Sequence, residues 1–227
     1  MQRSPTVEEI CAVAKRAIST FKSKNLVSCI TGNAACLLYG TSRQSHIFLE
    51  LDIIVLSEDH PPRKLEEMLT AEDKDFYLIQ PKGSPDAPKV LCSKLPSKSD
   101  ERKRGCKVNV LVPSMLDLPV VQRDRLEKIG DVLVLHPVLL LFTKLRTWSD
   151  RRISSRSYMQ STQHNDDVRY ISELLSIVRG RGENVSRGGA QWIPMTTMDA
   201  AWCRLAEYAE EYPTSKTNLR VIGFIQR

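Results

Sequence analysis

The feature that most constrains the fold is an apolar run, residues 47–56, that contains two carboxylates. Apart from Glu50 and Asp52, every side chain in the run is large and apolar, and Gly and Pro are absent, which is typical of a buried strand. Because side chains alternate along a strand, Glu50 and Asp52 are expected on one face, about 6–7 Å apart. The run therefore predicts either a divalent-cation site or an edge strand whose acids are solvated or paired with Lys or Arg.

The length and the net charge of the chain are compatible with many classes of globular protein. The chain has 227 residues, which is enough for one ordinary domain or slightly more, with a sizeable core. It contains 33 Lys and Arg against 27 Asp and Glu, so its formal net charge is +6. This moderate excess suits an anionic ligand such as a nucleotide or RNA, but ordinary proteins also carry it.

Cysteine usage indicates a reducing compartment, and we expect a cytoplasmic protein. The six cysteines show neither a CxxC pair nor a Cys/His ligand spacing, which argues against a zinc site and against a secreted disulfide framework. The N-terminal residues lead into an amphipathic helix rather than an apolar signal segment. No run approaches the roughly 18–20 apolar residues of a membrane span, so we expect no membrane partner.

The first part of the chain predicts a helix, a strand and a glycine turn. Thr6 begins a capping box, and apolar residues at helical spacing predict a helix over residues 6–24. A short strand over 26–31 then ends at Gly32, and a second helix is expected to begin with Asn33 as its cap. Such a turn forms an anion pocket when backbone N–H groups point outward, but it is also an ordinary strand-to-helix connection.

Further strands and a basic segment follow the acidic run. Strands are expected at 76–79 and 90–92 and again at 107–112, where Asn109 is the central residue. Between them, residues 94–107 are expected as an exposed basic loop, which is either a solvated hairpin tip or a contact for phosphate or RNA. Residues 126–135 predict a hairpin around Gly130 and Asp131.

The second part of the chain changes to a helical period at Pro137. A helix is expected there with Lys144 on or beside its apolar stripe, where a lysine is either a partly exposed rim residue or a functional one. Residues 149–163 are expected as a polar segment, and a second helix begins near Asp166 and Asp167. A last helical region is expected over 197–226. We therefore divide the chain into an α/β domain, 1–135, and a helical subdomain, 136–227.

Taken in order, these elements resemble the nucleotidyltransferase superfamily with the polymerase-β-like fold. The resemblance is carried by Gly32-Asn33, by Arg43, by the run from Glu50 through Asp52, and by Lys144, Arg152 and Asp167 in the second half. It covers roughly residues 25–178 and extends to minimal nucleotidyltransferases, including the toxins of abortive-infection systems. It implies an α+β fold, a mixed sheet flanked by helices, followed by the C-terminal helical subdomain.

The resemblance also implies a chemistry. Members of the family bind a nucleoside triphosphate with Mg²⁺ or Mn²⁺ and transfer a nucleotidyl group to an acceptor hydroxyl. Carried over, Glu50 and Asp52 would be catalytic metal ligands, and Asn109 would occupy the position of the third catalytic carboxylate. The phosphates of the nucleotide would be held by Gly32, Asn33, Arg43, Lys144 and Arg152, while Asp167 would orient Lys144 or the acceptor.

Asn109 is the main departure from the family pattern, because an amide cannot accept a proton from a hydroxyl and brings no charge to a metal. The first acid is also Glu rather than Asp, and Asn33 replaces a small residue. The second hypothesis is therefore a catalytically inactive member that binds a nucleotide or a protein. A third is an RNA-binding protein that uses basic stretches, although few aromatic residues lie near them.

Overall fold

The computed structural model describes residues 4–42, 50–83, 86–96, 104–153, 157–186 and 188–224. Its helices are α1 (Val7–Ser23), α2 (Gly32–Leu38), α3 (Pro62–Glu72), α4 (Pro137–Ile153), α5 (Ser157–Gly180), α6 (Met195–Glu211) and α7 (Lys216–Val221). Its strands are β1 (Ser28–Thr31), β2 (Leu51–Val55), β3 (Phe76–Ile79), β4 (Val90–Leu95), β5 (Arg104–Leu111), β6 (Glu127–Ile129) and β7 (Val132–Val134). The chain has two compact units: unit 1 comprises Met1–Met115 and Val120–Leu135, and unit 2 comprises Leu116–Pro119 and His136–Arg227.

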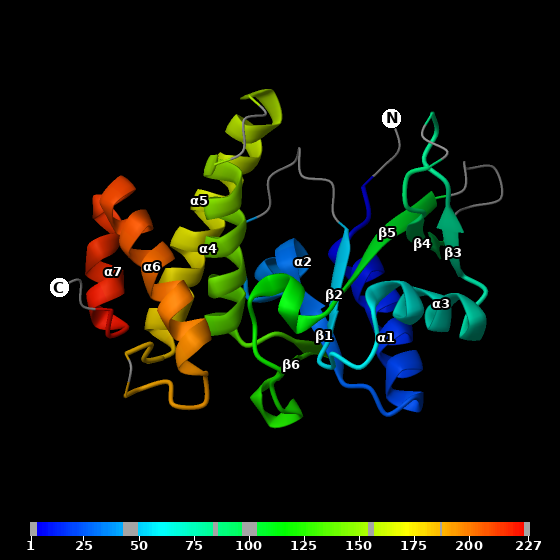
Figure 1. The fold of residues 1–227 in the computed structure, drawn as a ribbon, viewed down its shortest axis with the longest axis horizontal. Coiled ribbons are helices and arrows are strands. Elements are labelled where there is room, and N and C mark those ends of the chain that lie inside the picture. The colour runs from blue at the N-terminus through cyan, green and yellow to red at the C-terminus, as the bar shows by residue number, and fades with distance from the viewer. Residues whose placement is uncertain are drawn as a thin grey trace. The chain divides into compact units, whose positions relative to one another are not determined.

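Unit 1 is built on a mixed sheet. Among the described residues, the strand order is β3-β4-β5-β2-β1-β7-β6, in which β2 pairs antiparallel with β1 and parallel with β5 (Figure 1). The acidic strand therefore lies inside the sheet, and the edge position of the alternative was wrong, although Glu50 is paired with a lysine, Lys107, as that alternative expected. Its interior position follows from Leu51, Ile53, Ile54 and Val55, which are all fully buried. The predicted α+β fold with a mixed sheet is confirmed.

The two faces of the sheet differ, and β5 shows this most clearly. Cys106, Val108 and Val110 are buried, whereas Lys107 and Asn109 between them are partly exposed. This alternation is the pattern of a strand with one face in the core and one face open. Chemistry that needs access to a ligand is therefore confined to the face that carries Lys107 and Asn109.

Helix α1 covers part of the buried face and is held there by charged residues. Its predicted capping box is present, since Glu9 N donates to Thr6 Oγ1 at 3.2 Å and Thr6 N donates to Glu9 Oε2 at 2.8 Å. Glu9 also accepts two bonds from the Arg104 guanidinium, at 2.7 and 2.9 Å. Arg104 was expected in an exposed basic loop but belongs to β5, where it is paired with this cap. Lys107 lies in β5, as expected for the strand over 107–112, and alternates with core residues. Residues 97–103 of the expected loop lie outside the described residues.

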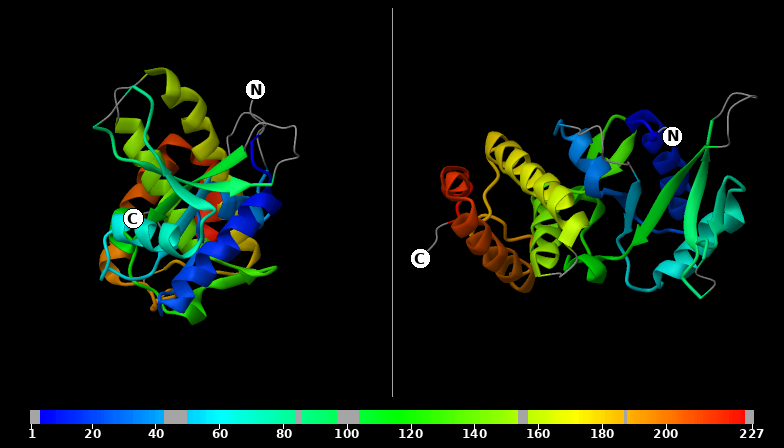
Figure 2. Two further views of the ribbon diagram at one scale, coloured as in Figure 1. Left: turned by 90° about the vertical axis from the view of Figure 1, so that its right-hand side faces the viewer. Right: turned by 90° about the horizontal axis from the view of Figure 1, so that it is seen from above.

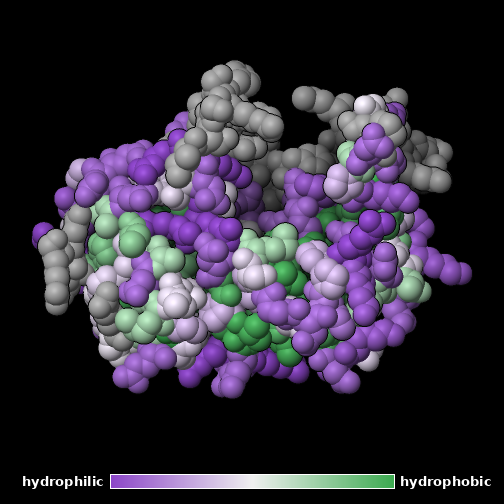
Figure 3. Space-filling view, in the orientation of Figure 1, coloured by the Kyte–Doolittle hydropathy of each residue, from purple (hydrophilic) through white to green (hydrophobic). Residues whose placement is uncertain are grey.

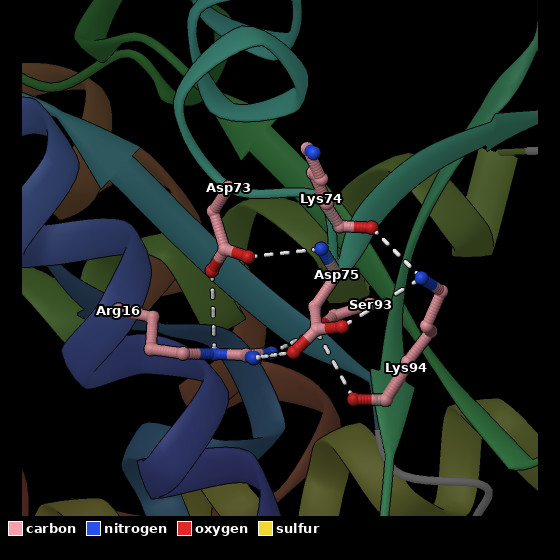
Figure 4. Close-up of polar contacts among 6 residues, drawn as sticks. All are labelled: Arg16, Asp73, Lys74, Asp75, Ser93 and Lys94. Atoms are coloured by element: carbon pink, nitrogen blue, oxygen red, sulfur yellow. Dashed lines mark hydrogen bonds and ion pairs between the residues drawn. The ribbon is translucent and has the colours of Figure 1, made fainter.

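A second charged group fixes the hairpin of β3 and β4 onto α1 (Figure 4). Arg16 donates to Asp75 Oδ2 at 2.5 Å and to the buried Ser93 Oγ at 2.6 Å, and its guanidinium lies 5.4 Å from the centroid of the Phe76 ring. Asp73 accepts from the Asp75 N–H at 2.9 Å and so shapes the turn before β3. The sheet thus keeps a fixed register where it meets the helix.

Unit 2 is helical. Helices α4 and α5 pack side by side along much of their length, and α6 and α7 pack against them (Figure 2). The polar segment 149–163 is largely helical: α4 runs to Ile153, and α5 begins at Ser157 rather than near Asp166 as expected. Arg151 and Arg152 remain helical because each has a carboxylate on a neighbouring helix to pair with. The expected helix over 197–226 is interrupted by Pro213, which separates α6 from α7.

The surface visible in Figure 3 is mostly hydrophilic, with hydrophobic patches between the polar residues. Large apolar side chains exposed among the described residues are Ile79, Met115, Val120, Met195 and Val221. Across the same residues, no helix combines the length and the hydrophobicity that would let it cross a membrane.

Candidate functional site

The acid pair lies on the open face of the sheet in unit 1. Asp52 is directly opposite Asn109 on β5, and Glu50 immediately precedes β2. The Asn109 Nδ2 donates to Glu50 Oε2 at 2.8 Å and to Asp52 Oδ1 at 2.6 Å. One atom therefore lies within bonding distance of both carboxylates, which shows that the two acids converge on a single point.

Gly32 provides the space for one of these carboxylates. Its φ is +66°, and a Cβ added there would lie 1.9 Å from Asp52 Oδ2. Only glycine suits this position, because any side chain would displace the Asp52 carboxylate and would also be strained by the positive φ. The glycine at this turn is therefore required for the position of the Asp52 carboxylate on the acidic strand.

The helix after this turn begins two residues earlier than predicted. Asn33 was expected to cap it, but α2 starts at Gly32 and the cap position is held by Thr31. The positive φ of Gly32 allows the chain to turn directly from β1 into the helix. Asn33 therefore lies within the first turn of α2, next to the residue that contacts Asp52.

Thr31 is a residue of the site that sequence reasoning missed. It pairs with Asp52 across β1 and β2, so both side chains are on the same face of the sheet. Its Oγ1 is buried without a hydrogen-bond partner among the described residues, and the residue is only 2% exposed. The Thr31 hydroxyl is therefore a polar group on the face that carries Asp52. Strand pairing, which the sequence does not display, is the signal that identifies it.

Lys107 was expected only as part of the basic segment 94–107, and its contact with Glu50 was missed. Its Nζ donates to Glu50 Oε2 at 2.8 Å, so that oxygen accepts from both Lys107 and Asn109. The signal was available in the sequence, because Lys107 stands two positions before Asn109 on a strand and therefore shares its face. Cys92 on β4 is opposite Lys107. Burial raises the pKa of the Cys92 thiol, and the Lys107 charge lowers it in part.

The remaining predicted residue of the first half, Arg43, lies outside the described residues. No group of three or more His, Cys, Asp or Glu side chains that could hold a metal ion occurs in the part of the chain that the structure describes. The acids available at this point are therefore Glu50 and Asp52, with Asn109 as the third side chain.

Unit 2 brings two of the predicted residues together. Lys144 on α4 and Asp167 on α5 are both buried, with 4.0 Å between Lys144 Nζ and Asp167 Oδ1. Arg151 donates to Asp167 Oδ2, and the Lys144 ammonium lies 4.9 Å from the centroid of the Tyr170 ring. Burial raises the pKa of Asp167, and Lys144 and Arg151 lower it in part.

The structure places Arg152 differently from these two residues. It donates to Glu207 Oε2 at 2.6 Å and to Glu211 Oε2 at 3.3 Å, both on α6. Its guanidinium also lies 4.8 Å from the centroid of the Trp148 ring. It is Arg151, one position earlier, that contacts Asp167. The phosphate-binding role predicted for Arg152 stays a prediction.

Solved structures provide the comparison that decides the fold. The chain is similar to the crystal structure of an antigenic nucleotidyltransferase-like protein from Paracoccidioides brasiliensis, with a TM-score of 0.62 and 16% sequence identity over 94% of this chain and 93% of that chain. This chain has a nucleotidyltransferase-like fold. The fold predicted from the order of motifs is thus confirmed. At 16% sequence identity, the similarity is evident from the structures and not from the sequences.

Two other solved structures are similar to this chain to a lower degree. One is the protein JHP933 from Helicobacter pylori, with a TM-score of 0.46 and 11% identity over 96% of this chain and 98% of that chain. The other is the antibiotic-resistance factor ANT(2'')-Ia, with a TM-score of 0.42 and 9% identity over 94% and 97%. The fold assignment rests on the first comparison alone. No protein-family profile and no curated protein sequence matches the chain.

Proposed function

We propose that the protein binds a nucleoside triphosphate together with one divalent cation, Mg²⁺ or Mn²⁺, on the open face of unit 1, and transfers a nucleotidyl group to an acceptor hydroxyl. The observation that carries this proposal is the convergence of Glu50 and Asp52 on one atom, Asn109 Nδ2, beside Gly32. The nucleotidyltransferase-like fold supports it. The acceptor is an RNA, a protein or a small molecule that carries a hydroxyl group.

The residues at this point fit a divalent cation. Carboxylate oxygens are the ligands that Mg²⁺ prefers, and the position between them is held in the structure by an amide nitrogen. A half-turn of the Asn109 amide would present its carbonyl oxygen to a cation instead. The buried Thr31 hydroxyl, which has no hydrogen-bond partner in the part of the chain that the structure describes, would bond with cation-bound water or with a phosphate oxygen.

A bound divalent cation would neutralise phosphate charge and polarise the phosphoryl group. The chain's own contribution is to position the reactants: Glu50 and Asp52 would hold the cation, and Gly32 leaves the space that the Asp52 carboxylate occupies. In the transfer, the acceptor oxygen bonds to the α-phosphorus while the bond to the bridging oxygen breaks. Pyrophosphate leaves, and the hydroxyl proton passes to water.

A second candidate function is favoured by one residue. Asn109 stands directly opposite Asp52, so no carboxylate is available there to take the acceptor's proton. A protein with this arrangement would bind the nucleotide without turning it over. Its role would then be that of a nucleotide-dependent interaction module.

Two measurements test both candidates. With millimolar Mg²⁺, each of the four ribonucleoside triphosphates is added while the melting temperature and the release of pyrophosphate are followed. Ligand at about 100 times its Kd stabilises a folded protein by about 2.7 kcal/mol, which shifts the melting temperature by several degrees. A shift with pyrophosphate release supports the transferase, and a shift without release supports the inactive binder.

Asp52→Asn should remove both the shift and the release, because it halves the charge that meets the cation. Asp131→Asn is the matched control, since Asp131 is an exposed acid of unit 1 that pairs with Lys15 away from the acid pair. If no nucleotide changes the melting temperature of the unmodified protein, with or without Mn²⁺ in place of Mg²⁺, both candidates fail.

A further inference from the structure

Lys107 places a positive charge of the protein directly beside the acid pair. Its Nζ lies 2.8 Å from Glu50 Oε2, and the same oxygen accepts from Asn109 at 2.8 Å. Both donors come from alternate positions of β5, so their place is set by the parallel pairing of β5 with β2. The register of β2 and β5 therefore determines that Lys107 and Asn109 both lie beside Glu50.

The charges at this point do not suit two divalent cations. Glu50 and Asp52 contribute two negative charges and Lys107 contributes one positive charge, so the three side chains sum to a single negative charge. A second divalent cation beside Glu50 would have to approach the Lys107 ammonium, and like charges this close repel strongly. Asn109 supplies no charge to offset that repulsion.

We propose that Lys107 takes the place of one divalent cation, so that the site holds a single metal ion and the Lys107 ammonium binds a phosphate oxygen of the nucleotide. This inference rests on the proposed function, since it names how that site meets its ligand. The Lys107 side chain is 42% exposed, so a phosphate can reach it. A lysine ammonium is an effective point charge for phosphate.

The pair with Glu50 also explains how the ammonium is kept in position before the nucleotide binds. Glu50 Oε2 faces two donors, so the carboxylate holds Lys107 while Asn109 keeps the carboxylate oriented toward Asp52. When a metal ion replaces the amide nitrogen between the acids, Glu50 is drawn toward the metal. The Lys107 ammonium would then donate its hydrogen bond to a phosphate oxygen of the nucleotide instead of to Glu50.

The test counts metal ions directly by electron paramagnetic resonance of Mn²⁺, with the α,β-methylene analogues of the four ribonucleoside triphosphates as probes that cannot be turned over. The unmodified protein should bind one Mn²⁺ per chain in the ternary complex. The variant with both Lys107→Gln and Asn109→Asp, which has a third carboxylate and no ammonium, should bind two. Two ions in the unmodified protein would overturn the inference.

Lys107→Gln alone should weaken binding of the analogue about tenfold, which corresponds to the loss of one charge-assisted hydrogen bond. Lys15→Gln is the matched control: it removes the same charge from unit 1 and breaks an ion pair with Asp131. Equal affinity of Lys107→Gln and the unmodified protein would show that Lys107 only pairs with Glu50. Failure of the unmodified protein to bind any Mn²⁺–nucleotide complex would instead reject the proposed function.

Discussion

Two lysine–carboxylate pairs, Lys107 with Glu50 in unit 1 and Lys144 with Asp167 in unit 2, differ in almost every respect. Lys107 and Glu50 in unit 1 are 2.8 Å apart, with side chains 42% and 34% exposed. Lys144 and Asp167 in unit 2 are 4.0 Å apart and only 8% and 3% exposed. The open pair can exchange its partner for a ligand at little cost. The buried pair is almost closed to solvent, and its charges lie between α4 and α5. The phosphate-binding role predicted for Lys144 stays a prediction.

The largest difference should appear in stability when each lysine is removed. Lys144→Ala leaves a buried carboxylate with Arg151 as its remaining charged partner here, and we expect the free energy of unfolding to fall by about 3–5 kcal/mol. Lys107→Ala should cost less than about 1 kcal/mol, as for exposed pairs in general. Urea unfolding of both variants measures this.

Lys144→Met separates the two causes of the loss, because it keeps most of the side-chain volume and removes the charge. A loss close to that of Lys144→Ala would assign the cost to the charge. Equal losses for Lys144→Ala and Lys107→Ala would contradict the contrast between a buried and an open pair.

The next effect concerns the backbone that supports the open acids. Gly32→Ala adds a Cβ that overlaps the Asp52 carboxylate and occurs at φ +66°, so we expect a loss of about 2–3 kcal/mol. Gly130→Ala is the matched control: its φ is +58°, but no atom lies within 4 Å of the added Cβ. It should cost only about 1–2 kcal/mol. Thermal unfolding compares the two, and a smaller loss for Gly32→Ala would mean that Asp52 moves freely.

The smallest effect is the pH dependence of the buried pair. Since burial raises the pKa of Asp167 above its unfolded value of 3.8, its contribution to stability is fully present below that value and is lost as the pH rises through the folded pKa. Asp167→Asn should therefore remove a decline in stability that begins near pH 4. Lys144→Met removes a charge that lowers this pKa, so the decline should extend to higher pH.

Asp131 provides a control of opposite sign. Its hydrogen bond with Lys15 lowers its pKa, so its contribution is present above the unfolded pKa and is lost as the pH falls through the folded one. Denaturant unfolding between pH 3 and 7 should show Asp131→Asn and Asp167→Asn changing the slope in opposite directions. The same sign for both would reject the role of burial at Asp167.

Local patterns were sufficient to predict much of the fold. The capping box at Thr6, the apolar run around Asp52 and the hairpin at Gly130 each contain their own signal within a few residues, and the structure has all three. The ends of α4 and α5 were not predictable in this way. Polar residues there are helical because they bind carboxylates on other helices, which is a property of packing rather than of sequence.

The candidate site shows the same limit. The sequence places Glu50 and Asp52 on one face, but the neighbours of that face, Thr31 and Lys107, follow from pairing between strands far apart in the chain. In unit 2, the rotational position of each residue around α4 determines which neighbouring helix its side chain contacts. Lys144 and Arg151 are two turns apart and share a face toward Asp167, whereas Arg152 is rotated toward α6.

Unit 2 also includes a short segment from the middle of the chain. Leu116–Pro119 belongs to it, although the residues on either side belong to unit 1, and Asp117 binds Arg146 at 3.2 Å and Arg204 at 2.7 Å. The chain therefore passes between the units three times. Neither unit can be transplanted as a continuous cassette: a fragment cut at residue 136 leaves Asp117 behind, and a chimaera that exchanges the helices must carry these four residues with them.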